Sequence, residues 1–125
     1  MPAGSLVSVV DDDESVRESL PDLLREFGFA VQSFSSAEDF LASGFLGQTR
    51  CLILDIAMPG MSGLDLQQEL KVRRHAIPIV FITAQGDEAI RPRLLAEGAV
   101  ECLFRPFSEA ALLEALNVAL RLRRV

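Results

Sequence analysis

Histidine and cysteine are scarce in this chain, which has one histidine, His75, and two cysteines, Cys51 and Cys102. Zinc centres use about four such ligands at short, regular spacings, and no such spacing occurs here. His75 precedes Pro78 in a loop-like stretch, where it is poorly placed to act as the base of a Ser-His-Asp or Cys-His hydrolase. Both cysteines fall in apolar, strand-like runs, so we expect buried free thiols.

Other absences narrow the class of protein further. No glycine-rich phosphate loop follows the first strand-like run, no basic-then-apolar leader opens the chain, and no apolar run approaches membrane length. The net charge of -6 disfavours a nucleic-acid-binding surface. Half of the 125 residues are apolar, which suits one domain with its own core. We therefore expect a single cytoplasmic domain over residues 1–125 that contacts neither nucleic acid nor membrane.

The sequence contains a fivefold alternation of strand-like and helix-like segments. The expected strands are residues 5–10, 29–34, 51–55, 78–83 and 100–104, each followed by a helical pattern. This alternation predicts an α/β fold, a doubly wound five-stranded parallel sheet of order 2-1-3-4-5 with five helices. The alternating pattern of residues 29–34 favours a strand at or near the sheet edge.

Two prolines complicate the expected helices. Pro21 lies inside the first helix and is expected to kink it, because the ring removes a backbone donor. Pro92 lies within the weak helical segment 86–97, so this helix either starts late, with Pro92 in its first turn, or is distorted there.

Polar residues follow the expected strands at the points where the strands end. In the order 2-1-3-4-5 the first and third strands are neighbours, so Asp11, Asp12 and Asp55 should converge, with Thr83 and Arg105 beside them. Converging carboxylates repel one another and require protons or a cation, and oxygen ligands favour Mg²⁺. The plain alternative is that the aspartates cap turns and a helix, and one of residues 11–13 should indeed be an N-cap.

This combination of groups suits phosphoryl transfer. A hydroxyl from Thr83 and a cation from Arg105 are what the oxygens of a phosphoryl group require. Asp55 would then be the nucleophile, attacking an activated phosphoryl group to form an acyl phosphate. Arg105 could instead turn outward and pair with a surface acid.

Several motifs occur in a family-specific order along nearly the whole chain. They are Val10-Asp11-Asp12, Asp55-x-x-Met58-Pro59-Gly60-Met61-Ser62-Gly63, Phe81-Ile82-Thr83-Ala84, Gly98-Ala99 and Arg105-Pro106-Phe107. With these motifs the sequence resembles the receiver domain of bacterial two-component response regulators, particularly the FixJ-type branch. The resemblance implies a flavodoxin-like, CheY-like fold in which Asp55 accepts a phosphoryl group from the phosphohistidine of a sensor histidine kinase.

The resemblance also implies roles for individual residues. Mg²⁺ should be bound by Asp12, Asp55 and the main-chain carbonyl of Ala57, with Asp11 acting mainly through water. Thr83 should be the switch hydroxyl that moves onto the phosphoryl group.

The Ala84 amide should help to hold the phosphoryl group, and the Arg105-Pro106 peptide should be cis. Ala57 and Gln85 flank the phosphoryl position in the family pattern and should influence how fast water attacks it.

Three departures from the family pattern affect the switch. Arg105 stands where the family has lysine, and the only lysine, Lys71, lies in an expected helix and cannot substitute. Cys102 occupies the position of the switch aromatic, and Pro92 interrupts the helix that usually carries the output surface. These departures motivate an alternative function, a receiver-like interaction module that phosphorylation no longer controls.

A third hypothesis, a Mg²⁺-dependent phosphatase of the haloacid-dehalogenase kind, is disfavoured. That class has a second aspartate two residues after the nucleophile, and here the position is Ala57, so turnover has no evident proton donor. We therefore expect a signalling domain that catalyses only its own phosphorylation and dephosphorylation.

The same resemblance suggests partners. They are a sensor histidine kinase, a second copy of the chain on phosphorylation, and a helix-turn-helix DNA-binding domain beyond Val125 that would serve transcription regulation. A single-domain regulator is the alternative to that last expectation.

Overall fold

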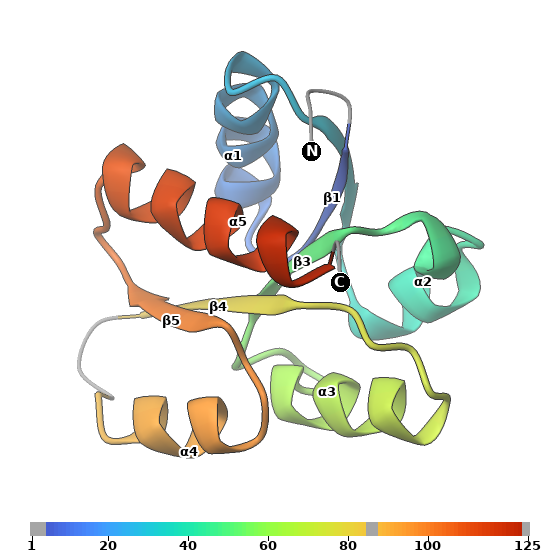
Figure 1. The fold of residues 1–125 in the computed structure, drawn as a ribbon. Helices are drawn as coiled ribbons and strands as arrows, with labels where there is room; N and C mark the ends of the chain where they lie inside the picture. The colour runs from blue at the N-terminus through green and yellow to red at the C-terminus, as the bar shows by residue number, and fades with distance from the viewer. Residues whose placement is uncertain (1–4, 85–87, 124–125) are drawn as a thin grey trace.

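The computed structural model of the chain describes residues 5–84 and 88–123. Within these residues five parallel strands form one sheet of order β2-β1-β3-β4-β5, so the predicted topology is confirmed (Figure 1). The strands are β1 (Leu6–Val10), β2 (Ala30–Phe34), β3 (Cys51–Asp55), β4 (Ile79–Thr83) and β5 (Glu101–Phe104). β2 lies at the edge, as its alternating pattern predicted.

Helices cover both faces of the sheet. They are α1 (Glu14–Glu26), α2 (Ala37–Ala42), α3 (Gly63–Val72), α4 (Ile90–Ala96) and α5 (Glu109–Arg123), with a short 3-10 turn, η1 (Leu46–Gln48). α1 and α5 pack on one face, and α2, α3 and α4 pack on the other (Figure 1). No helix of the described residues has the length and apolar character needed to cross a bilayer.

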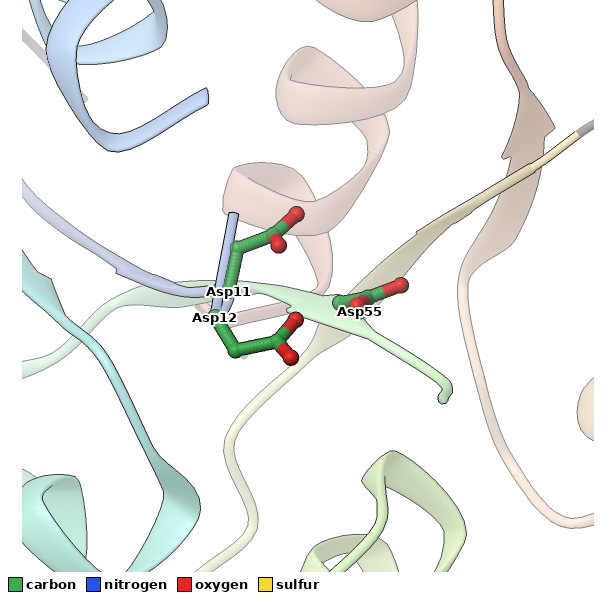
Figure 2. Close-up of side chains that lie close together, drawn as sticks. All are labelled: Asp11, Asp12 and Asp55. Atoms are coloured by element: carbon green, nitrogen blue, oxygen red, sulfur yellow. The ribbon is translucent and has the colours of Figure 1, made fainter. Parts of the chain in front are cut away.

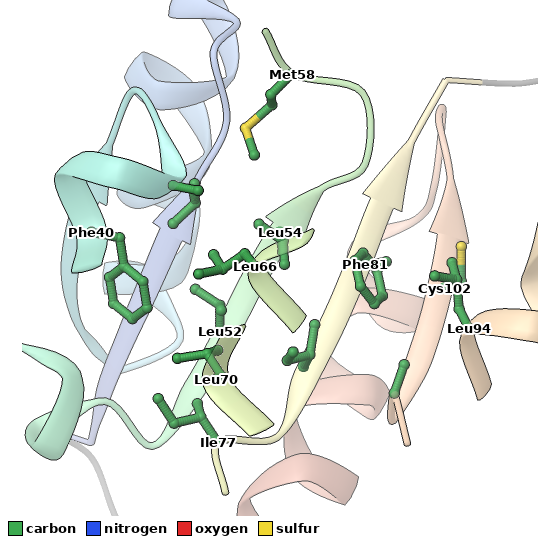
Figure 3. Packing of buried hydrophobic residues seen from close by; sticks show 14 of the residues in the cluster. Phe40, Leu52, Leu54, Met58, Leu66, Leu70, Ile77, Phe81, Leu94 and Cys102 are labelled. Atoms are coloured by element: carbon green, nitrogen blue, oxygen red, sulfur yellow. The ribbon is translucent and has the colours of Figure 1, made fainter. Parts of the chain in front are cut away.

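The sheet separates two apolar layers. Alternate strand residues enter opposite layers, as Leu52 and Leu54 show against Ile53 on β3. Figure 3 shows the layer under α2, α3 and α4, where Leu52 and Leu54 pack near Phe40 and Phe81. This separation places the central strands in a dry environment on both faces, which explains their continuous apolar sequence.

The two cysteines lie in different layers. Cys51 belongs to the layer under α1 and α5, Cys102 belongs to the opposite layer, and both are buried. Burial raises the pKa of the Cys51 thiol to about 12, so this sulfur stays protonated and unreactive.

Short polar signals define where the helices begin. Asp13 caps α1, Ser36 caps α2, and Ser62 forms a reciprocal capping box with Asp65 at the start of α3. α4 begins late, at Ile90, and Pro92 therefore lies in its first turn. This confirms the first of the two expectations for this helix. Residues 86 and 87 of the expected helix lie outside the described residues.

The structure also shows the surroundings of Pro21 in α1 and of Pro106 after β5. Pro21 is buried inside α1, which is continuous from Glu14 to Glu26, and a kink there stays a prediction. The Arg105-Pro106 peptide bond is cis, as the resemblance implied.

Candidate functional site

Three carboxylates converge at the carboxyl edge of the sheet. Asp11 and Asp12 follow β1, and Asp55 ends the adjacent strand β3, where Val10 pairs with Leu54. One carboxylate oxygen from each aspartate lies within 4.8 Å of the others, and Figure 2 shows the three side chains at the adjoining strand ends. Asp11 and Asp55 are buried, and Asp12 is exposed. The strand order predicted from the sequence therefore brings these residues together.

Burial makes the charged form of this cluster costly. The pKa of Asp55 is raised to about 7, first by desolvation and then by the neighbouring charge of Asp11. Desolvation also raises the pKa of Asp11, although Asp11 Oδ1 accepts a 2.8 Å hydrogen bond from the Asp13 amide. Asp11 Oδ2 is buried and has no hydrogen-bond partner among the described residues. An acceptor-only oxygen of this kind, beside two further carboxylates, fits a hard divalent cation such as Mg²⁺.

Thr83 and Arg105 extend the site along the next two strands. Thr83 ends β4 and is buried, and Ala84 follows it at an exposed position. The Arg105 amide donates a 2.9 Å hydrogen bond to the Thr83 carbonyl, so the pairing of β4 with β5 continues past the end of β5. The hydroxyl and the cation therefore stand on neighbouring strands at the same edge as the acids.

The Arg105 side chain pairs with Asp13. Nη1 of Arg105 lies 3.8 Å from Oδ2 of Asp13, and the arginine side chain is 31% exposed. The positive charge of Arg105 also lowers the pKa of Asp11 and of Asp55, against the larger effect of burial. The guanidinium thus lies within electrostatic range of the acidic cluster, but its ion-pair partner is the exposed carboxylate of Asp13. This outward pairing with a surface acid is the alternative that the sequence analysis gave for Arg105.

The loop after Asp55 is tightly closed. The Gly63 amide donates a 2.9 Å hydrogen bond to the Ile56 carbonyl. A Cβ atom on Gly63 would lie 2.3 Å from the Asp55 carbonyl oxygen, so only glycine fits here. Ala57 lies within this loop at an exposed position. The loop geometry therefore fixes the backbone on either side of the proposed carbonyl ligand.

Two supporting contacts were not predicted from the sequence. Glu38 of α2 accepts a 3.1 Å hydrogen bond from the Met61 amide, which fastens the β3–α3 loop to α2. Arg17 of α1 donates a 2.9 Å hydrogen bond to the Asp11 carbonyl. A pair separated by 23 residues leaves no local sequence pattern, so Glu38 had no signal by which it could be found.

Two residues with expected roles, Cys102 and Gln85, are not part of the acidic cluster that the structure describes. Cys102 is a buried core residue whose strand neighbour is Phe81 on β4, and its amide donates a 2.9 Å hydrogen bond to Glu101 Oε1. Gln85 lies outside the described residues.

Comparison with known proteins agrees with this geometry. Residues 7–117 match the family model of the response regulator receiver domain. Response regulator protein TodT of Pseudomonas putida is 43% identical over 94% of this chain and 52% of its own length. The solved structure of response regulator StyR matches with a TM-score of 0.89 and 49% identity, covering 98% of this chain and 62% of StyR. FixJ-N matches with a TM-score of 0.85 and 37% identity, covering 97% of this chain and 96% of FixJ-N.

The chain therefore belongs to the family of response regulator receiver domains, signalling domains whose standard function is to be phosphorylated by a sensor kinase. Within this family it is similar to the regulators TodT and FixJ, as the FixJ-type motifs indicated. The chain spans about half the length of the curated relatives it matches.

Proposed function

We propose that Asp55 is the phosphoryl acceptor of this receiver domain. The observation that carries the proposal is the convergence of Asp11, Asp12 and Asp55 within 4.8 Å at the carboxyl edge of the sheet. A carboxylate oxygen of Asp55 attacks the phosphorus of a phosphohistidine on a sensor histidine kinase. The new O–P bond forms as the P–N bond breaks, and the electron pair of that bond stays on the imidazole nitrogen.

Mg²⁺ is the cofactor that this site would hold. Asp12, Asp55 and the main-chain carbonyl of Ala57 would supply oxygen ligands, and Asp11 would act mainly through water. The buried oxygen of Asp11 that has no hydrogen-bond partner among the described residues supports this assignment. The ion would neutralise the carboxylates and the incoming phosphoryl oxygens. The protein holds its own oxygens in place before an ion binds. The Asp13 amide donates a hydrogen bond to Asp11, and the Gly63 amide closes the loop that follows Asp55.

The groups on β4 and β5 would bind the phosphoryl oxygens that face away from the ion. Thr83 supplies a hydroxyl and is the proposed switch residue, the Ala84 amide supplies a second donor, and Arg105 supplies the cation. Cys102 occupies the other switch position of the family pattern. It has no ring to rotate, so its part in the switch would be a repacking of the layer under α2, α3 and α4.

The whole protein is proposed to be a cytoplasmic transcription regulator. Its curated relatives include transcriptional regulatory proteins about twice as long as the matched region. We accordingly propose a DNA-binding output domain in the same polypeptide and a homodimer that forms on phosphorylation. The receiver would catalyse only its own phosphorylation and dephosphorylation.

Incubation with acetyl phosphate followed by intact-mass measurement tests the acceptor. We expect one phosphoryl adduct that requires Mg²⁺ and is absent from Asp55→Asn. Asp22→Asn is a matched control, since Asp22 is an exposed carboxylate of α1 that is paired with Arg25. An adduct that persists in Asp55→Asn would contradict the assignment.

The alternative function, an interaction module without phosphorylation control, is favoured by the pairing of Arg105 with Asp13. Absence of any adduct, together with partner binding that Asp55→Asn leaves unchanged, would support this alternative. Arg105→Lys would then show whether the arginine is the cause.

A further inference from the structure

Asp13 uses its two carboxylate oxygens for different purposes. Oδ1 accepts hydrogen bonds from the Ser15 amide at 2.9 Å and from the Ser15 hydroxyl at 2.8 Å, which caps α1. Oδ2 is the oxygen that lies 3.8 Å from Nη1 of Arg105. Because the cap fixes the orientation of the carboxylate, the position of Oδ2 is set by the start of α1 rather than by the arginine.

Arg105 is held loosely and keeps unused hydrogen-bonding capacity. A separation of 3.8 Å permits attraction between charges but exceeds the length of a hydrogen bond. Its Nε atom is buried and has no hydrogen-bond partner among the described residues. A guanidinium offers five donors in a planar fork, and phosphate can accept two of them in parallel. Arg105 therefore lies next to the acidic cluster, and its guanidinium has hydrogen-bond donors that Asp13 does not use.

We propose that Asp13 is a positioning residue that holds the Arg105 guanidinium in the resting domain, and that a phosphoryl group on Asp55 competes with Asp13 for it. This inference rests on the proposed phosphorylation of Asp55. A phosphoryl group carries nearly two negative charges, whereas the carboxylate carries one. Because Oδ1 of Asp13 already accepts the hydrogen bonds that cap α1, Asp13 has one oxygen left for the guanidinium, whereas a phosphoryl group can accept with two. Asp13 therefore sets how much of the arginine's attraction is available to the phosphoryl group.

Equilibrium binding of beryllofluoride with Mg²⁺, a phosphoryl mimic, measures this competition. Asp13→Asn keeps an oxygen that can cap α1 and removes the charge that attracts Arg105. We expect Asp13→Asn to tighten binding of the mimic by about two- to fivefold, the range that a partly exposed ion pair supports. In an Arg105→Gln background the same substitution should have a clearly smaller effect, because no guanidinium is left to release.

Glu14→Gln is the matched control for general electrostatics. It removes one negative charge from the next residue, which lies in the first turn of α1, and it should leave binding of the mimic unchanged. An effect of Asp13→Asn that is equal with and without Arg105 would overturn the proposal. Weaker binding in Asp13→Asn would also overturn it, since Asp13 would then be assisting the phosphoryl site.

A second measurement does not depend on phosphoryl chemistry. The Nε–Hε NMR resonance of Arg105, assigned by its loss in Arg105→Gln, should shift in Asp13→Asn and not in Glu14→Gln. If the mimic fails to bind the wild-type chain, the proposed function fails and the competition with it, and the NMR shift then reports only the resting pair. If the mimic binds but neither signal responds to Asp13→Asn, the inference about Asp13 fails and the proposed function stands.

Discussion

Neutralising Asp55 should stabilise the metal-free domain at alkaline pH. The pKa of Asp55 is raised from 3.8 to about 7 by burial and by the charge of Asp11. A carboxyl whose pKa is raised by folding contributes stability that is fully present below its unfolded value and is lost as the pH rises through its folded value. The wild-type chain should therefore lose stability between about pH 4 and about pH 8. Asp55→Asn removes this titration.

The magnitude follows from the size of the shift. A rise from 3.8 to about 7 is about three pKa units, which corresponds to about 4 kcal/mol at about 1.36 kcal/mol per unit. Asp55 is 6% exposed, so solvent screening reduces this value little. Asparagine also alters the hydrogen bond with the Ile56 amide, so we expect a gain of about 2–4 kcal/mol in unfolding free energy at about pH 8. Below about pH 4 the gain should approach zero.

Urea unfolding followed by far-ultraviolet circular dichroism measures the gain, since the chain has no tryptophan or tyrosine to report by fluorescence. Each variant is compared at about pH 5 and about pH 8 in the presence of a chelator. Mg²⁺ should then raise the stability of the wild-type chain at the higher pH more than that of Asp55→Asn. A gain that is the same at both pH values, or a loss at the higher pH, would refute the reasoning from a buried charge.

Substitutions at three positions test the surroundings of Asp55. Gly63→Ala should lower the unfolding free energy by more than about 2 kcal/mol in urea titrations, because the new Cβ would lie 2.3 Å from the Asp55 carbonyl oxygen. Ser62→Ala should cost about 1 kcal/mol in the same assay through loss of the capping box, and Ser62→Asn should restore most of it. A charged residue in place of Ala57 should change the dephosphorylation rate measured by intact mass against time, and an unchanged rate would remove Ala57 from the group of residues that control water attack.

The topology and the acidic cluster could be predicted because each follows from a repeated pattern. Continuous apolar runs such as residues 51–54 identify strands that are covered on both faces. The alternation of strands with helices then restricts the strand order, and that order alone places Asp11 and Asp12 beside Asp55. The prediction did not depend on any side-chain conformation.

The supporting contacts could not be predicted, because they depend on side-chain direction. Arg105 could turn toward Asp55 or toward an exposed acid, and the structure pairs it with Asp13, a side-chain direction that no sequence pattern specifies. The contact of Glu38 with the Met61 amide joins a helix to a distant loop and has no characteristic spacing. The start of α4 could not be fixed from the sequence either. Local rules allowed both a late start with Pro92 in the first turn and a longer helix distorted at Pro92, and the structure has the late start.

The hydrogen bond from the Arg105 amide to the Thr83 carbonyl has a consequence for the order in which the proposed anion contacts form. This bond joins the two backbones, so under the proposed function the Thr83 hydroxyl and the Arg105 guanidinium would bind the phosphoryl group as two linked donors. If Thr83 moves onto the phosphoryl group as proposed, the joined backbone of Arg105 would have less conformational freedom left to lose. Arg105 would therefore bind the phosphoryl group at a reduced entropic cost after Thr83 has bound it. A substitution that weakens phosphoryl binding by either residue should also weaken binding by the other.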